Sequence, residues 1–486
     1  MTGLRLKQKN LIAGQWCDSE SQRRFDVRNP ADWEEVLHSY PKSTTKDADR
    51  AIESAAQGYQ SWKNVPIAER AAIFRRVAEL IRAHSVQIAK IITAENGKLL
   101  SESYAEIDST LHEMEFQVGE GLRQFGVASE CPKANLVGMS RKEPLGVVSA
   151  ITPWNFPFNV PFRKLVPAMM AGNTVILKPA GQTPAVGELV ALLLLEAGLP
   201  GTALQFVTGS GSELSASLVA HSTVEAVTFT GSTEVGRDIA TLAAKTFTRT
   251  QLEMGGKNPI VVLEDADLDS AADAIIVGAF SCAGQWCTAT SRVIVQESVA
   301  DDLVSHILTR INKIVVGPGN TSTSTMGPVC GKHQLHSILE HIETAQSEGA
   351  VLISCEGSYH EAKREMGCFI APTVFDQVDQ SMSIAKDEVF GPVLSIMRVK
   401  DYTAALDVAN DVVYGLSSSI FTNNYQRAMH FVEHTEVGLT HVNLHSAYKE
   451  PHLCFGGYKE SGFGLPEAGS TGIQFFQEEK AIYLAK

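Results

Sequence analysis

Two cysteines lie close together in the segment FSCAGQWCTATSR, at Cys282 and Cys287. A cysteine thiolate attacks electrophilic carbon, and the resulting thioester needs an activated water to release its acyl group. A free thiol has a pKa of about 8.5 and is only a few per cent thiolate at neutral pH. We therefore expect a shifted pKa or a neighbouring base at the nucleophilic cysteine.

A candidate for the base that activates water is Glu253, which precedes a Gly-Gly pair in QLEMGGKNP. A carboxylate held in a pocket acts as a general base. Most glutamates are solvated surface residues, so the order of residues leaves both interpretations open.

A third polar residue, Asn155 in TPWNFPFNVPFRK, lies between aromatic residues just after an expected strand. A side-chain amide in such a place can hydrogen-bond an oxyanion. It can equally satisfy the backbone of a turn.

The segment FTGSTEVGR predicts a strand that ends at Gly231 and Ser232, where a helix begins. Small residues let backbone N–H groups approach an anion, and a helix N-terminus favours negative charge. The alternative is an ordinary strand–helix turn. Upstream, TGSGSEL lacks the third glycine of the dinucleotide fingerprint.

The elements that position these residues follow from alternation along the chain. Apolar, β-branched runs alternate with amphipathic segments, which predicts a parallel, doubly wound sheet covered by helices. The expected strands are 146–152, 174–179, 226–232 and 259–267, and the expected helices are 69–98, 162–172, 185–198 and 234–245. The series that starts near residue 259 indicates a second α/β lobe. Polar segments at 130–140 and after 469 predict a projecting β arm that pairs with another subunit.

Composition limits the classes of function. The 486-residue chain has a net charge of −14 and no dense Lys/Arg block, which argues against a nucleic-acid or anionic-membrane surface. Neither a signal peptide nor an apolar run long enough to span a bilayer is evident. The eight cysteines are scattered, without metal-ligand spacing, so we expect reduced thiols, no metal site and a cytoplasmic protein.

Seven motifs, taken together, connect these residues to a known family. They are PWNFP, LKPA, FTGST, LEMGGKNP, GQWCTATSR, EVFGPV and FGGYKESGFG, in the family's order and spacing. Over essentially its whole length the chain resembles the NAD(P)-dependent aldehyde dehydrogenase superfamily, nearest the succinate-semialdehyde-dehydrogenase-like branch.

The resemblance implies catalytic roles for three residues. Cys287 matches the nucleophile, Glu253 the general base, and Asn155 the oxyanion hole together with the backbone N–H of Cys287. Cys282 then becomes small core filler.

The resemblance also implies a site for NAD or NADP. Lys178 matches a ligand of the adenosine ribose, Ser232 a pyrophosphate contact and Glu388 a ligand of the nicotinamide ribose. The full expected set is Thr152, Pro153, Trp154, Lys178, Gly181, Gly231, Ser232, Glu388 and Phe390. Gly181 stands where many NAD-preferring members carry Glu, so we expect NADP to be accepted.

The expected substrate contacts are less uniform. Arg163 matches an arginine that binds a substrate carboxylate in the semialdehyde branch, while Ser281 replaces that branch's second arginine. The loop VNLHSAYKEPHLCFGG supplies His445 and Lys449 as other anchors, and Phe455 matches an apolar wall.

The resemblance implies an aldehyde dehydrogenase-like α/β fold. We expect a Rossmann-type cofactor domain (1–125 and 146–255), an α/β catalytic domain (256–440) and a small β oligomerisation arm (126–145 and 466–486). A homodimer or homotetramer follows from such an arm.

The predicted function is NAD(P)-dependent oxidation of a short aldehyde with an anionic tail to the carboxylic acid. A dehydrogenase of neutral or aromatic aldehydes is the alternative. A coenzyme A-acylating enzyme and a non-enzymatic binding protein are disfavoured, because Glu253, Asn155 and Cys287 are all retained.

Overall fold

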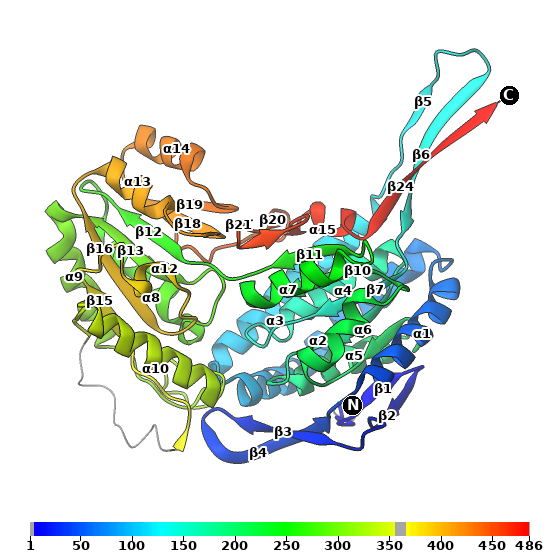
Figure 1. Ribbon diagram of the computed structural model, residues 1–486, viewed down its shortest axis with the longest axis horizontal. Coiled ribbons are helices and arrows are strands. Elements are labelled where there is room, and N and C mark those ends of the chain that lie inside the picture. The colour runs from blue at the N-terminus through cyan, green and yellow to red at the C-terminus, as the bar shows by residue number, and fades with distance from the viewer. Residues whose placement is uncertain (1–3, 355–365, 486) are drawn as a thin grey trace.

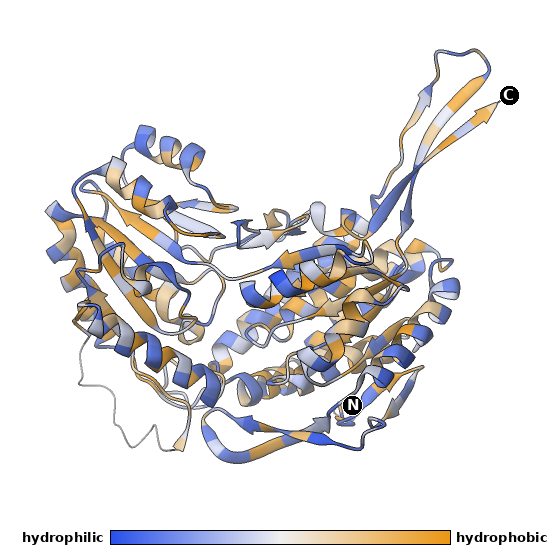
Figure 2. Cartoon of the chain, in the orientation of Figure 1, coloured by the Kyte–Doolittle hydropathy of each residue, from blue (hydrophilic) through white to orange (hydrophobic). Residues whose placement is uncertain are grey.

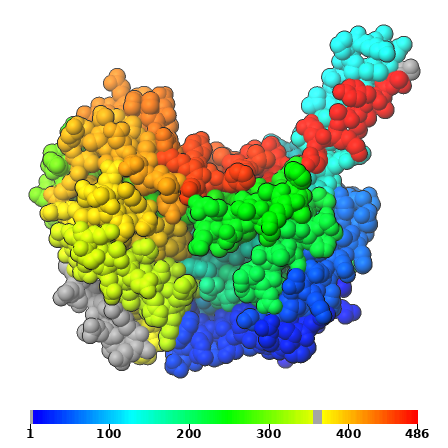
Figure 3. Space-filling view, viewed as in Figure 1, coloured from blue at the N-terminus to red at the C-terminus, as the bar shows by residue number. Residues whose placement is uncertain are grey.

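The computed structural model describes residues 4–354 and 366–485, so Cys355 and the outermost residues of the predicted domains lie outside it. The chain forms two α/β lobes, each built on its own sheet, and an arm that stands clear of them (Figures 1 and 3). This confirms the predicted α/β fold with two sheets and a β arm.

The first sheet has eight strands, five of them parallel at its centre. In spatial order the strands are β2 (Gln15–Cys17), β1 (Asn10–Ile12), β9 (Leu204–Phe206), β8 (Thr174–Lys178), β7 (Val147–Ile151), β10 (Val224–Thr230), β11 (Arg249–Glu253) and β22 (Gly462–Phe463). The expected strands at 146–152, 174–179 and 226–232 are therefore present.

Helices cover both faces of this sheet because its strands are apolar on both sides. Val148 faces one core and Val147 the other. The first core includes α2 (Ile67–Asn96), α3 (Leu100–Leu122), α4 (Asn159–Ala171) and α5 (Pro184–Glu196). The second includes α1 (Thr45–Trp62), α6 (Gly211–Ala220) and α7 (Thr233–Ala243).

The second sheet has seven strands, parallel except at one edge. In spatial order they are β14 (Val351–Leu352), β15 (Thr373–Asp376), β16 (Val393–Val399), β13 (Thr290–Gln296), β12 (Asn258–Val262), β18 (Ser417–Phe421) and β19 (Leu439–Val442). Its helices are α8 (Leu268–Phe280), α9 (Glu297–Ile311), α10 (Lys332–Ser347), α12 (Ser383–Lys386), α13 (Tyr402–Asn410) and α14 (Tyr425–His434). Figure 2 shows these strands as mostly hydrophobic, as a buried sheet requires.

The arm is a three-stranded antiparallel sheet of β5 (Ala128–Glu130), β6 (Leu136–Pro144) and β24 (Gln477–Ala485). It joins segments from near the first quarter and the end of the chain (Figure 1). Smaller elements are β3 (Arg24–Asn29), β4 (Asp32–Pro41), β17 (Tyr414–Gly415), β20 (Cys454–Phe455), β21 (Tyr458–Lys459), β23 (Glu467–Ala468), α15 (Thr471–Gln474) and the 3₁₀ turn η1 (Ser281–Gly284).

Two further observations concern the whole described chain. Its seven cysteines are free thiols. Within the described ranges, every helix is too short or too polar to cross a bilayer. The functional division of the lobes stays a prediction.

Candidate active site

The nucleophile candidate follows a strained turn. In η1 the residues Cys282, Ala283 and Gly284 have φ of 50°, 54° and 70°, a left-handed conformation that costs energy for non-glycine residues. The Glu102 carboxylate accepts the N–H of Cys282 at 2.6 Å. This contact from α3 helps to hold the turn that leads into Cys287.

Cys287 lies where two cavities meet. One, of about 360 Å³, lies on the side of α3 and α4, and the other, of about 260 Å³, lies at the strand ends of the first sheet. Asn155, Thr230 and Cys287 line both of them, whereas Cys282 is buried and lines only the first. The two cysteines are thus placed differently, and the choice of Cys287 as the nucleophile stays a prediction.

The thiol of Cys287 has no lowered pKa in this structure. Burial raises its pKa to about 12, and the charges of Arg163 and Lys449 only partly oppose this. Of the two expected alternatives, a shifted pKa or a neighbouring base, the shift runs against the thiolate and the base stays a prediction. The thiol is protonated at neutral pH, so attack on carbon requires that its proton be removed.

Asn155 is held from both sides. Its side-chain Nδ2 donates to the carbonyl of Gln285 at 3.0 Å, which turns the amide toward the loop of Cys287. Its own carbonyl accepts from Lys98 Nζ at 2.7 Å, and Lys98 also donates to Glu106 at 2.7 Å in a fully buried ion pair. These contacts fix both the side chain and the backbone of Asn155, and an oxyanion donor needs such a fixed position.

Glu253 ends β11 but lines neither of the two cavities. A Cβ on Gly456 would lie 3.0 Å from its Oε1, and its Oε2 lacks a hydrogen-bond partner within the described part of the chain. Burial and the nearby Glu467 raise the pKa of Glu253 well above its usual range, although Lys164 opposes them. The carboxyl group must therefore turn toward Cys287 before it can serve as the predicted base.

The cavity at the strand ends gathers most of the predicted cofactor residues. Pro153, Trp154, Gly231, Ser232, Glu388 and Phe390 line it. Trp154 and Phe390 pack edge to face, with ring centroids 5.4 Å apart. Glu388 accepts the N–H of Gly256 at 2.9 Å, and burial raises its pKa to about 7.

Three other predicted cofactor residues, Thr152, Lys178 and Gly181, lie outside that cavity, at the same edge of the sheet. Ile151 pairs with Lys178 across β7 and β8, so both strands end there. Burial lowers the pKa of Lys178 to about 8, and its Nζ donates to the Pro179 carbonyl at 3.2 Å. Gly181 is exposed, and a Cβ there would come only within 3.9 Å of Phe25. Ligands bind at this edge in open α/β sheets.

The cavity beside α3 and α4 gathers four of the five predicted substrate residues. Arg163, Ser281, Lys449 and Phe455 line it. His445 does not line any cavity found among the described residues, because its ring turns back to accept the N–H of Ala447 at 3.2 Å.

Several polar residues of the site escaped the sequence reasoning. Gln334 lines the cofactor-side cavity and donates to the Phe390 carbonyl at 2.9 Å. The others are Lys98, Glu102, Glu106, Glu113, Lys164 and Glu467. For the glutamates of α3, the sequence did carry a signal: their spacing places Glu102, Glu106 and Glu113 on one face of the helix.

Together these features suit acyl transfer. A thiol and an amide donor stand between two cavities, and a carboxyl group lies within the same region. For comparison, the sequence profile "Aldehyde dehydrogenase family" matches residues 16–482.

Three relatives extend this comparison. The alpha-ketoglutaric semialdehyde dehydrogenase of Bacillus subtilis is 38% identical over 475 residues, covering 98% of this chain and 97% of that protein. The phenylacetaldehyde dehydrogenase of Pseudomonas fluorescens is 37% identical over 492 residues, covering 99% and 97%. The crystal structure of a Staphylococcus aureus betaine aldehyde dehydrogenase in complex with NAD+ superposes with a TM-score of 0.95 at 32% identity, covering 99% and 95%. Because the profile and these relatives span nearly the full length, the chain belongs to the aldehyde dehydrogenase family.

Proposed function

We propose that this enzyme oxidises a short semialdehyde with an anionic tail to the carboxylic acid, through a thioester on Cys287. The observation that carries the proposal is the place of Cys287 and Asn155, which line both the cavity at the strand ends and the cavity that contains Arg163 and Lys449.

The catalytic residues act in sequence. The Cys287 thiol releases its proton to solvent water and the sulfur attacks the aldehyde carbon, and the oxyanion that forms accepts hydrogen bonds from Asn155 Nδ2 and from backbone N–H. Each such donor contributes about 3 kcal/mol. Glu253 then turns from Gly456 and deprotonates the water that hydrolyses the thioester. Its retention favours hydrolysis over transfer of the acyl group to another thiol.

A nicotinamide cofactor fits the cavity at the strand ends. Glu388 offers a carboxylate acceptor, Trp154 and Phe390 offer aromatic surface, and Ser232 caps the N-terminus of α7. When bound, such a cofactor accepts the hydride of the substrate. The Staphylococcus aureus relative, crystallised with NAD+, supports the same class of cofactor for this chain.

Both NAD and NADP fit our proposal, because Gly181 places no carboxylate near a 2′-phosphate. Gly181→Glu should weaken NADP selectively, by about one to a few kcal/mol through like-charge repulsion. Kd values for both cofactors, measured on the wild type and the variant, check this. Equal losses for NAD and NADP would contradict it.

We infer a homo-oligomer in the cytoplasm. The arm projects from the body (Figure 3). It carries exposed apolar side chains such as Tyr483 and Leu484. Free cysteines are typical of a reducing compartment.

The substrate proposal is tested with aldehydes of equal length that differ only in charge. Succinate semialdehyde and butanal form such a pair, with reduced cofactor followed by absorbance. We expect kcat/KM to favour the anionic aldehyde by about tenfold or more, as one charge-assisted hydrogen bond contributes. A preference for butanal or phenylacetaldehyde would instead favour the second candidate, which the Pseudomonas fluorescens relative keeps open.

A further inference from the structure

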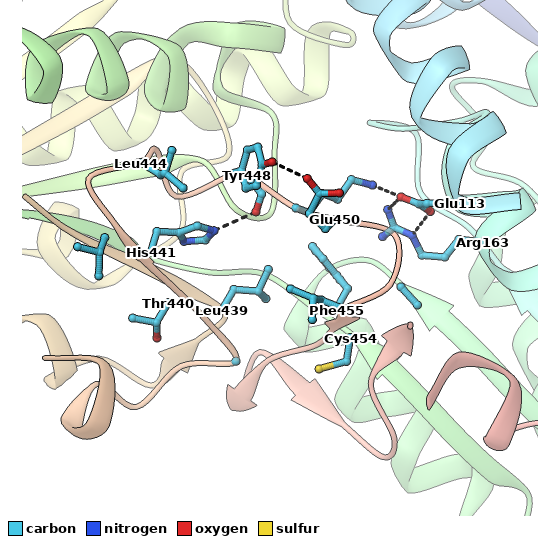
Figure 4. Close-up of a pocket in the computed structure, with 15 residues that line it drawn as sticks. Glu113, Arg163, Leu439, Thr440, His441, Leu444, Tyr448, Glu450, Cys454 and Phe455 are labelled. Atoms are coloured by element: carbon cyan, nitrogen blue, oxygen red, sulfur yellow. Dashed lines mark hydrogen bonds and ion pairs between the residues drawn. The ribbon is translucent and has the colours of Figure 1, made fainter. Parts of the chain in front are cut away.

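A single carboxylate, Glu113 of α3, pairs with both Arg163 and Lys449, the two cations that line the cavity beside α3 and α4. Its Oε2 and Oε1 accept from Arg163 Nε and a terminal guanidinium nitrogen at 2.9 and 3.0 Å. The same Oε1 forms an ion pair with Lys449 Nζ (Figure 4). Asn159 Oδ1 also accepts from Arg163 at 2.7 Å and from Lys449 at 3.4 Å.

These contacts leave the two cations in unequal positions. The Arg163 side chain is 7% exposed, and its planar fork is occupied by Glu113 and Asn159. Its remaining nitrogen lies 3.9 Å from Glu467, and the Phe455 ring covers the guanidinium at 4.8 Å. The Lys449 side chain is 31% exposed and lines three cavities, the largest about 710 Å³ at the mouth. An incoming anion therefore meets Lys449 first.

The charges of the cluster add to one positive. Glu113 is ionised, because Arg163 and Lys449 hold its pKa at about 2 although burial opposes this. The neighbouring Glu467 is matched by Lys164, a second buried ion pair. Arg163 and Lys449 thus share one negative partner.

We propose that Glu113 is a specificity-determining residue: it neutralises one of the two cations and so restricts the cavity to aldehydes whose tail carries a single negative charge, bound by Lys449. Glu113 is a positioning residue, since it acts through Arg163 and Lys449. This inference rests on the proposed function and specifies the charge of its substrate.

The test varies the charges of cluster and substrate independently. The probes are butanal, succinate semialdehyde and (2-oxoethyl)malonate, which share the aldehyde group and carry none, one and two carboxylates. The variants are Glu113→Gln, Lys449→Gln and the double variant, which should leave the cluster at two, zero and one positive charges. Glu120→Gln is the matched control, because Glu120 lies on the same helix and pairs with Arg123, away from the cavities.

We expect the wild type to prefer the single carboxylate. Glu113→Gln should shift the ratio of kcat/KM for two carboxylates over one upward by about tenfold or more. Lys449→Gln should abolish the preference for the anion, and the double variant should restore it. Each kcat/KM is divided by the value that the same variant gives for butanal, so that a merely structural loss cancels, and Glu120→Gln should leave these ratios within about twofold of those of the wild type.

The outcomes separate the two proposals. A wild type without any preference for the anion would overturn the proposed function and this inference with it. A wild type that prefers the anion, with a double variant no different from Lys449→Gln, would overturn the role of Glu113 alone. If Glu113→Gln does not fold, the comparison of the double variant with Lys449→Gln decides, because the double variant removes a cation together with its partner.

Discussion

At the scale of single residues, burial shifts the pKa values of both reactive groups upward. Burial raises the pKa of Cys287 to about 12 and raises that of Glu253 well above its usual range. The same burial means that the thiolate fraction of Cys287 at neutral pH is very small.

The raised pKa predicts a distinctive pH dependence of alkylation. Below a pKa, the thiolate fraction rises about tenfold per pH unit. Iodoacetamide should therefore modify Cys287 slowly at pH 7 and about tenfold faster per unit up to pH 10, without a plateau. Mass spectrometry of the peptide that contains Cys287 gives the rate, and Cys282→Ala should leave it unchanged. A plateau near pH 8 would mean an ordinary or lowered pKa.

A second prediction concerns Glu253→Gln. Glutamine keeps the shape but cannot accept a proton from water, so turnover should fall by about 10²- to 10⁴-fold. Because the base acts after hydride transfer, one equivalent of reduced cofactor should still form in a burst. Rapid-mixing absorbance checks this. Loss of the burst as well would show that Glu253 is required for thiol attack or for the fold.

At the scale of elements, α3 organises the site through three carboxylates, of which Glu106 and Glu113 are buried and Glu102 is half-buried. Glu102 holds the turn before Cys287, Glu106 holds Lys98 and the N-terminus of α4, and Glu113 holds Arg163 and Lys449. Since these side chains share one helix, a change in its position would move the nucleophile loop, the oxyanion amide and the tail site together.

The Lys98–Glu106 pair gives a prediction for this helix. Glu106→Gln leaves Lys98 buried without its partner, which should cost about 3–5 kcal/mol of the free energy of unfolding. Lys98→Met together with Glu106→Gln should recover much of that stability. Urea unfolding measures both.

The kinetics of the same variants test the positioning of Asn155. In the double variant kcat should stay at least about tenfold below the wild-type value, because the backbone carbonyl of Asn155 has lost the Lys98 donor. Small displacements of a catalytic group are costly in rate. A stable double variant with normal kcat would show that the pair serves folding only.

At the scale of the whole molecule, the arm is the part that a monomer accounts for least. It extends away from the two lobes as three strands (Figure 1). The side chains of Val127, Tyr483 and Leu484 are exposed. Exposed apolar side chains and open strand edges are typical of surfaces that pair with another chain.

Replacing such residues should dissociate the proposed oligomer. Val127→Asp with Leu484→Asp should lower the molar mass measured by light scattering to that of one chain, while the far-UV circular dichroism spectrum stays unchanged. Tyr425→Asp, at a 76% exposed position on α14, is the control and should leave the mass unchanged. An unchanged mass in the arm variant would place the interface elsewhere.

Much of the fold was determined by the sequence alone, because its signals are local. The expected helix at 69–98 is α2, and the expected strand at 174–179 is β8. Apolar runs and turn residues report burial and direction within a few positions of themselves. The family motifs likewise are short, so Cys287, Asn155 and the cofactor residues could be named without coordinates.

The charge of the substrate site was decided only by the tertiary structure. Arg163 was expected to meet a substrate carboxylate, yet it meets Glu113, 50 positions earlier, which also binds Lys449, 336 positions away. Burial also raises the pKa of Cys287, and burial together with the distant Glu467 raises that of Glu253. Electrostatic energies depend on distances in space and on exclusion of water, and neither is encoded in any short stretch of sequence.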